Sequence, residues 1–201
     1  ALLQSVQVIQ FLKKPSLAEL VATRVEFLRG YQDEAYAATY RAFVDKVQQA
    51  EARAVAGSTR LAETVARYLF KLMAYKDEYE VARLHTDPAF KAQLDAMFPN
   101  GYDIKYNLAP PTISKRDPVT GHLIKRQFGG WMRSAFGMLA ARKGWRGGAL
   151  DIFGKTAERR EERELIESYL KDLEQIGAQL APTKHAAAVA VASVPDEIRG
   201  Y

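Results

Sequence analysis

Residues 61–86 read LAETVARYLFKLMAYKDEYEVARLHT, and this stretch decides the fold that the sequence predicts. Apolar side chains recur in it at spacings of three and four residues, which is the pattern of one face of a helix. The members of this face are Leu61, Val65, Tyr68, Leu69, Leu72 and Met73. Because so wide a stripe needs covering from more than one side, we expect a long central helix over about residues 59–86 with other helices around it.

The same helical face continues in polar residues. Its spacing runs on to Lys76, Tyr79 and Arg83, so the face ends in two cations and a phenol. A buried cation needs a partner, and Asp77 and Glu80 lie close to Lys76 in the sequence. One interpretation is a polar network that fixes how neighbouring elements dock. The other is that both cations lay their methylene groups along the core edge and keep their charges in water.

Composition sets wide bounds on the fold and the partners. The chain has 201 residues, of which 48% are hydrophobic and 26% charged, enough for one full core or two small ones. Its net charge of +5 permits an anionic partner. The absence of cysteine excludes disulfides and an iron–sulfur cluster ligated from within this chain. No uncharged apolar run is long enough to span a bilayer, so we expect a cytoplasmic protein with no membrane partner.

The remaining signals predict a mainly α fold. Residues 1–15 form a connector, and residues 16–201 form a single helical domain with a β-hairpin insertion. Ser16 and Glu19 make a capping box that starts a helix ending at Gly30, and a second helix covers residues 33–54. Further helices start at Asp87 with Pro88, near residue 129 and after Thr156, and an alanine-rich segment covers residues 184–193.

A small antiparallel β insertion is predicted over about residues 102–128. Residues 102–108 alternate apolar and polar side chains, which is typical of a half-buried strand. Residues 112–116 and 122–128 are two further extended candidates. Between them, residues 117–121 read DPVTG, a turn with proline at its first bend and glycine where the chain leaves.

Cations gather in and after this insertion, and Asp117 is the only acid among them. They are Lys115, Arg116, Lys125, Arg126, Arg133, Arg142, Lys143 and Arg146. If the hairpin and the following helix fold back on each other, these side chains share a face that could hold phosphates, an acidic protein or nucleic acid. Alternatively, the cations protect a hairpin edge against strand pairing. Trp131 and Trp145 flank the cations, and we expect both to pack in the core or at an interface.

No catalytic or metal-binding set can be assembled from the sequence. His85, His122 and His185 lie on different elements, and no second histidine stands at ligand spacing. Phosphate-binding glycine motifs are absent. Adjacent carboxylates such as Asp77 and Glu78 point to different sides of a helix, which does not suit shared acid–base work. We therefore expect no catalytic residues, no metal and no cofactor in this segment.

Five segments resemble a known family. They are residues 66–86 (ARYLFKLMAYKDEYEVARLHT), 108–118 (LAPPTISKRDP), 121–132 (GHLIKRQFGGWM), 153–160 (FGKTAERR) and 192–201 (ASVPDEIRGY). In this order they are similar to the C-terminal region of the long, fused indolepyruvate ferredoxin oxidoreductases, which are thiamine-diphosphate-dependent 2-oxoacid oxidoreductases. The similarity covers roughly the final two-thirds of the chain, and residues 16–54 agree more loosely.

The resemblance implies a parent enzyme that oxidatively decarboxylates aryl pyruvates such as indolepyruvate. Its electron acceptor is ferredoxin, and coenzyme A is its acyl acceptor. The parent's thiamine diphosphate, magnesium and iron–sulfur cluster are implied to lie in other domains, and the parent is implied to be a homo-oligomer. This chain then looks like an accessory, non-catalytic domain excised from the C-terminal part of that oxidoreductase.

As a hypothesis, six residues are where this domain touches the rest of the parent or an anionic partner such as ferredoxin. They are Lys76, Tyr79, Arg83, Lys125, Arg126 and Trp131. The alternative is a free-standing basic helical module that binds nucleic acid or another anionic partner. The modest net charge disfavours nucleic acid, because dedicated binders concentrate more basic residues on one face.

Overall fold

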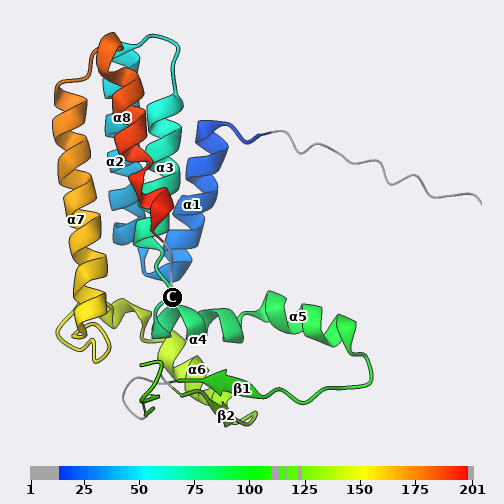
Figure 1. The fold of residues 1–201 in the computed structure, drawn as a ribbon. Coiled ribbons are helices and arrows are strands. Elements are labelled where there is room, and N and C mark those ends of the chain that lie inside the picture. The colour runs from blue at the N-terminus through cyan, green and yellow to red at the C-terminus, as the bar shows by residue number, and fades with distance from the viewer. Residues whose placement is uncertain (1–13, 110–113, 116, 122–123, 199–201) are drawn as a thin grey trace, which may run out of the picture. The chain divides into compact units, whose positions relative to one another are not determined.

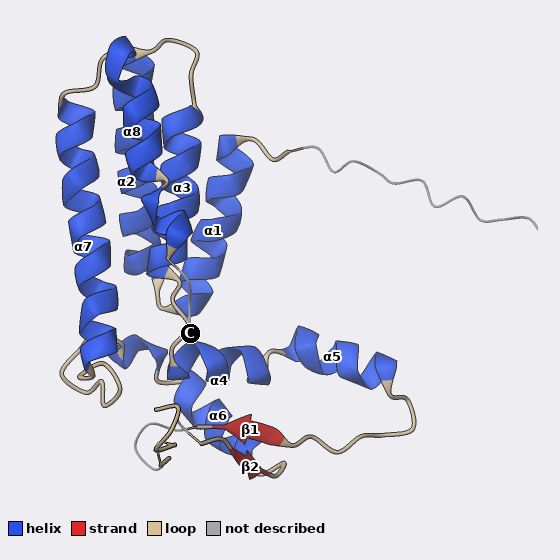
Figure 2. Cartoon of the chain, in the orientation of Figure 1, coloured by secondary structure: helices blue, strands red, loops and turns tan. Residues whose placement is uncertain are grey.

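The computed structural model describes residues 14–109, 114–115, 117–121 and 124–198. The chain divides into two compact units. Unit 1 comprises Ala1–Arg29, Glu34–Met73 and Ile166–Tyr201, and unit 2 comprises Gly30–Asp33 and Ala74–Leu165. The structure is mainly helical with one two-stranded antiparallel sheet, so the predicted fold class is confirmed (Figure 2). No helix in the described part of the chain is long and apolar enough to cross a membrane.

Unit 1 is a helical bundle. It contains α2 (Glu34–Ala54), α3 (Arg60–Met73), α8 (His185–Ala192), most of α1 (Leu17–Tyr31) and the second part of α7 (Ala157–Ala178), with the short 3-10 helices η2 (Pro182–Lys184) and η3 (Val194–Glu197) (Figure 1). The helix α3 packs against both α2 and α8, and Leu61, Val65 and Leu69 on its apolar stripe are almost fully buried. The predicted capping box is present, since the Glu19 N–H donates to Ser16 Oγ at 3.3 Å.

The prediction of a single helix over about residues 59–86 is wrong, because the chain forms two helices there. The helix α3 ends at Met73, and α4 (Glu78–Thr86) begins after a break. Asp77 is the N-cap of α4 and accepts a hydrogen bond from the Glu80 N–H at 2.8 Å. The hydroxyls of Tyr36 and Tyr31 donate to the carbonyls of Met73 and Tyr75, each at 2.9 Å. These bonds satisfy carbonyl groups that helix continuation would otherwise have used.

Unit 2 combines short helices with the small sheet. It contains α4, α5 (Pro88–Met97), β1 (Tyr106–Leu108), β2 (Arg126–Phe128), α6 (Met132–Ala140), the 3-10 helix η1 (Lys143–Trp145) and the first turns of α7. The helices α4 and α6 pack against each other. The apolar core is small: Ala82, Tyr106 and Phe136 are buried, with partly buried side chains around them. The predicted turn is present, with the Asp117 carboxylate accepting the N–H groups of Val119 and Thr120 at 2.8 Å.

Two local predictions need correction. The strand predicted over residues 102–108 pairs only over Tyr106–Leu108, because β2 stops at Phe128 and a glycine turn leads from there into α6. Trp131, expected to pack in the core or at an interface, is 65% exposed at the start of α6, so it does not pack in the core. The helix α5 starts at Asp87 and Pro88 as predicted, yet none of its residues is buried. Residues 1–13 of the predicted connector, and parts of the extended candidates 112–116 and 122–128, lie outside the described residues.

Candidate functional site

The interior of unit 2 is held by a buried ion pair. The Arg146 guanidinium donates through Nε and Nη2 to the two carboxylate oxygens of Asp77, the second bond at 2.9 Å. Its Nη1 donates to the Tyr31 carbonyl at 2.6 Å, and its centre lies 3.7 Å from the Tyr31 ring centroid. Burial opposes the charge, but the bonds and charge of Asp77 raise the pKa of Arg146 above its usual value. Arg146 therefore does not belong to the predicted cationic surface.

A second buried carboxylate fixes the loop after Arg146. Asp151 accepts hydrogen bonds from the N–H groups of Gly147, Phe153 and Gly154, at 2.7, 3.1 and 2.9 Å. It also accepts the Tyr79 hydroxyl at 3.2 Å. Burial and the neighbouring Asp151 charge raise the pKa of Tyr79 to about 12, so the phenol stays protonated. All these bonds stay within the fold, which makes the cluster structural.

The residues predicted on α4 and just before it do not form one surface. Tyr79 is only 1% exposed. Arg83 is half-buried and makes a bidentate ion pair with Glu80, in which both bonds are 2.8 Å. Lys76 is exposed. Of the two interpretations of this stretch, the Arg83–Glu80 pair fits the polar network, whereas exposed Lys76 fits the one in which the charge stays in water. The buried partner of Asp77 is Arg146, from a distant segment that helical spacing does not reveal.

The second predicted group, on the hairpin and at the start of α6, is exposed. Lys125, Arg126 and Trp131 all lie at the surface, and the Trp131 ring meets Phe128 edge-on at 6.1 Å. Not every predicted cation is free for a partner. Lys143, for example, donates through Nζ to the Gly30 carbonyl at 2.6 Å. The hairpin and the start of α6 thus expose two cations and an indole ring within residues 125–131.

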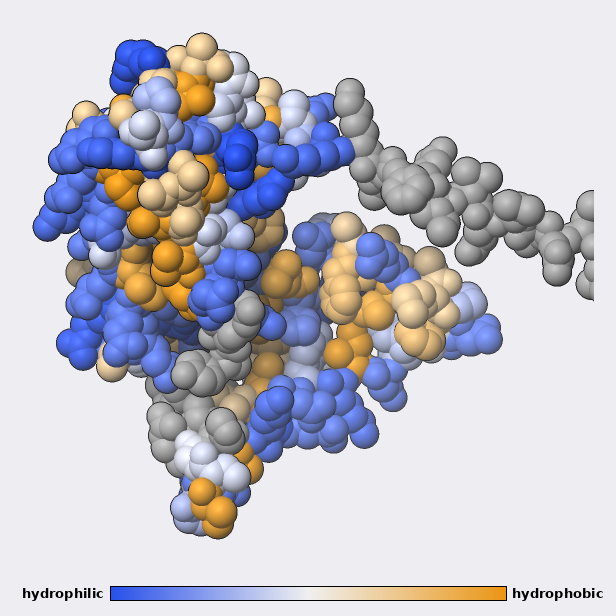
Figure 3. Space-filling model, turned by 45° about the horizontal axis from the view of Figure 1, so that its top comes forward, coloured by the Kyte–Doolittle hydropathy of each residue, from blue (hydrophilic) through white to orange (hydrophobic). Residues whose placement is uncertain are grey.

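Exposed apolar side chains are concentrated in unit 2. The described residues include fifteen large hydrophobic side chains that are exposed, and twelve of them belong to this unit. These twelve are Leu84, Phe90, Met97, Phe98, Val119, Ile124, Trp131, Met138, Trp145, Leu150, Ile152 and Leu165. Figure 3 shows apolar surface gathered over the part of unit 2 that α5 forms. An apolar surface of this kind is typical of a protein that binds a partner.

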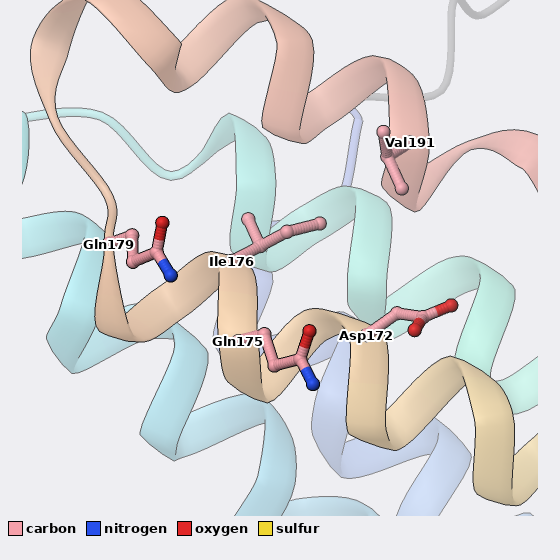
Figure 4. Close-up of a pocket in the computed structure, with 5 residues that line it drawn as sticks. All are labelled: Asp172, Gln175, Ile176, Gln179 and Val191. Carbon is pink, nitrogen blue, oxygen red and sulfur yellow. The ribbon is translucent and has the colours of Figure 1, made fainter.

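Each unit has a cavity lined by described residues. In unit 1, a depression of about 310 Å³ lies between α7 and α8, lined by Asp172, Gln175, Ile176, Gln179 and Val191 (Figure 4). Asp172 is its only ionisable lining residue, so this site offers no pair of groups for acid–base chemistry. In unit 2, a larger cavity of about 530 Å³ lies between α5 and residues 102–108, with His85 in its wall.

Unit 1 contains a cluster whose residue types suggest catalysis but whose bonds serve the fold. The Ser58 hydroxyl donates to Glu51 Oε1 at 2.7 Å, and the His185 ring lies at the same distance from that oxygen. Glu51 also accepts the N–H groups of Leu61 and Ala62, each at 2.9 Å, and so caps α3. Burial opposes its charge, but these hydrogen bonds lower the pKa of Glu51. Sequence spacing gave no sign of this cluster.

Among the described residues, no group of three or more histidine, cysteine or acidic side chains is placed to hold a metal ion. The chain folds as two helical units with structural polar clusters, and unit 2 carries exposed apolar and cationic side chains. The chain belongs to a family of unknown function, DUF6537, whose profile matches residues 17–201. No curated protein matches the chain, and no solved structure matches it. Family membership therefore brings no activity with it.

Proposed function

We propose that this chain is an accessory, non-catalytic domain of a cytoplasmic indolepyruvate ferredoxin oxidoreductase, in which it serves assembly or partner docking. The sequence support is the set of five ordered segments that resemble the C-terminal region of those enzymes. The structural observation that carries the proposal is the exposed apolar and cationic surface of unit 2. Thiamine diphosphate, magnesium, the iron–sulfur cluster and the coenzyme A reaction then belong to other domains of the parent.

The composition of this surface suits docking. Interfaces are enriched in aromatic residues, methionine and arginine, and unit 2 exposes Trp131, Met138 and Arg126. The buried polar groups of unit 2 that we described, Asp77 and Asp151, are fully engaged inside the fold. Contacts with a partner would therefore use the apolar and cationic side chains left at the surface.

An acidic protein is the partner that the charges favour. Lys125 and Arg126 lie next to each other on the hairpin with no described acid paired to either. Cations placed in this way raise the rate of encounter with an acidic protein, and added salt weakens the effect. Ferredoxin, the electron acceptor that the resemblance implies, is an acidic partner of this kind.

Charge reversal in the intact parent enzyme tests the docking role. Lys125→Glu with Arg126→Glu should lower turnover with ferredoxin about tenfold or more at low salt, because electrostatic steering changes on-rates by 10 to 1,000 times. Turnover with a small artificial electron acceptor should not change. The matched control reverses two exposed cations of unit 1, Arg41→Glu with Arg53→Glu. Unchanged turnover and an unchanged salt profile in the hairpin variant would refute the role of this surface.

The coding sequence around this segment tests the parentage separately. If the proposal is correct, the reading frame that encodes these 201 residues also encodes a thiamine-diphosphate-binding domain upstream. A gene that encodes nothing beyond this segment would overturn the assignment to the oxidoreductase, whatever the hairpin binds.

The second candidate is a basic module that binds nucleic acid. The observation that favours it is that Lys125, Arg126 and Trp131 are all exposed. Such a module binds single-stranded DNA by stacking and by contacts to phosphates. Its affinity should then fall steeply between 50 and 200 mM salt. Absence of any mobility shift with single-stranded or duplex DNA at low salt would remove this candidate.

A further inference from the structure

The cavity in unit 2, the larger of the two described above, has the size and lining of a small-molecule site. Its volume of about 530 Å³ falls within the range of 300–1,000 Å³ that is usual for such sites. The helix α5 supplies one wall and residues 102–108 supply another. The apolar lining residues are Phe90, Leu94, Phe98, Tyr102, Ile104, Tyr106 and Leu108, and His85 completes the wall.

His85 is held in a fixed orientation by aromatic rings. Its imidazole stacks on Phe136 with ring centroids 5.1 Å apart and an angle of 11° between the planes. It meets Tyr106 edge-on at 5.2 Å and Phe90 at 6.1 Å. These are favourable geometries for aromatic pairs. The ring is therefore positioned before any ligand arrives.

The imidazole nitrogens of His85 make no hydrogen bond to another described residue, although the side chain is half-buried. Burial first, and the positive charge of Lys76 second, lower the pKa of His85 below its ordinary value. At neutral pH the ring is therefore uncharged and offers one donor and one acceptor. A half-buried polar group without a protein partner is well suited to bind a ligand group that restores its hydrogen bond.

The walls of the cavity are less buried and less hydrogen-bonded than a protein core. No residue of α5 is buried, although Phe90 and Leu94 line the cavity from this helix. The opposite wall, residues 102–105, makes no backbone hydrogen bond to a described residue. Asp103 and Lys105 carry the only full charges in the lining, and these are opposite in sign. A neutral occupant is therefore favoured over a charged one.

We propose that this cavity binds a small neutral aromatic molecule that carries one hydrogen-bonding group, with its ring among the aromatic side chains and its polar group at His85. Aromatic rings supply much of the lining, so a planar ring can be contacted edge-on or in offset stacking. The hydroxyl or N–H group of the ligand restores a hydrogen bond to the imidazole. This inference does not depend on the proposed docking role.

Phenol and toluene are matched probes for the proposal, since they are nearly the same size and only phenol can bond to His85. We expect phenol to shift the NMR signals of the His85 ring in the full 201-residue chain, with saturation in the millimolar range. Phenol should bind about fivefold more tightly than toluene, as one neutral hydrogen bond allows. Benzoate should bind no more tightly than phenol. Equal binding of phenol and toluene, tighter binding of benzoate, or no saturable shift would each overturn the proposal.

Variants locate the binding site. His85→Phe keeps a ring against Phe136 but removes both nitrogens, so phenol should lose its advantage over toluene. Leu94→Trp fills the cavity from α5 and should abolish binding of both probes. Met97→Trp is its control, because Met97 lies on the same helix, is 68% exposed and does not line the cavity. If Leu94→Trp fails to fold, the His85→Phe comparison still decides, since an unchanged phenol preference there would overturn the role of His85.

Discussion

The two units of this chain are stabilised by different kinds of interior. Unit 1 buries apolar helix faces, and the side chains of Leu61, Val65 and Leu69 are almost completely shielded from water. Unit 2 has a small apolar core and buries more charged groups than unit 1, including Asp77, Arg146 and Asp151. It also leaves most of the exposed large hydrophobic side chains at its surface. A unit that leaves many large apolar side chains exposed is suited to binding, because that surface gains from being covered.

The stability of the two units should respond differently to mutation. A well-packed apolar core loses stability in proportion to the side-chain volume removed from it. A buried ion pair stabilises the fold little more than a pair of apolar residues in its place would. Removing only one partner is costly, because the other charge is left buried and unpaired. We therefore expect the largest losses of stability in unit 2 from substitutions of buried charged residues. In unit 1 we expect them from substitutions of large buried apolar residues.

The largest effect is expected from Arg146→Ala, which leaves the carboxylate of Asp77 buried without its partner. Loss of one member of a buried pair costs about 3–5 kcal/mol, and amide hydrogen exchange should show the loss in α4 and α6. Arg142→Ala, at an exposed cation nearby in the sequence, serves as the control and should cost less than about 1 kcal/mol. Replacing both partners, Arg146→Met with Asp77→Asn, keeps a side chain that can cap α4 and should recover part of the loss. Failure to recover would contradict a simple pairing role.

The next effect is expected from Leu69→Ala in α3, a residue with no exposed surface. Removal of a buried leucine side chain leaves a cavity and costs roughly 2–5 kcal/mol. Urea unfolding followed by hydrogen exchange of the α3 amides measures it. The control is Leu84→Ala on α4, where the side chain is 42% exposed. If the two substitutions cost the same, the burial of Leu69 would not account for its contribution to stability.

Local signals in the sequence predicted helix caps and a turn correctly. The capping box at Ser16 and Glu19, the Asp87 cap before Pro88 and the turn from Asp117 each form as expected. All three depend on residues within a few positions of one another, and short-range geometry alone determines them. The mainly α fold follows from the same signals together with helical periodicity.

Long-range partners account for what the sequence could not predict. The break after Met73 has a local sign, since Asp77 precedes Glu80 at the spacing of a helix cap, but the apolar stripe appeared to continue through it. The hydroxyls of Tyr31 and Tyr36 reach this segment from far away in the chain. The choice of Arg146 as the partner of Asp77 likewise joins positions 69 residues apart. Periodicity describes one helix at a time and cannot identify such pairs.

A smaller effect is expected from Gly154→Ala in the loop that Asp151 holds. An added Cβ atom would lie 2.2 Å from Asp151 Oδ2, which is too close for any contact. Because Asp151 is fixed by backbone N–H groups, the strain cannot be relieved cheaply, and we expect a loss of about 1–3 kcal/mol. Gly130→Ala, where an added Cβ meets nothing within 4 Å, is the matched control. A neutral result at Gly154 would show that this loop is more adaptable than the charged interior implies.

The smallest effect is the pH response of unit 2 through His85. Burial and the charge of Lys76 lower the pKa of His85 in the folded chain, while the unfolded chain keeps the ordinary value of about 6.5. Below that value the unfolded state binds more protons than the folded one, so stability is complete above about pH 6.5 and falls as the pH decreases through the folded pKa. An NMR titration of the His85 ring measures this pKa directly. Lys76→Gln should move it upward, because a neighbouring positive charge is removed, whereas Lys155→Gln should leave it unchanged. A pKa of His85 at or above 6.5 would show that its ring is more hydrated than the stacking on Phe136 implies, and would remove this contribution of unit 2 to the pH dependence of stability.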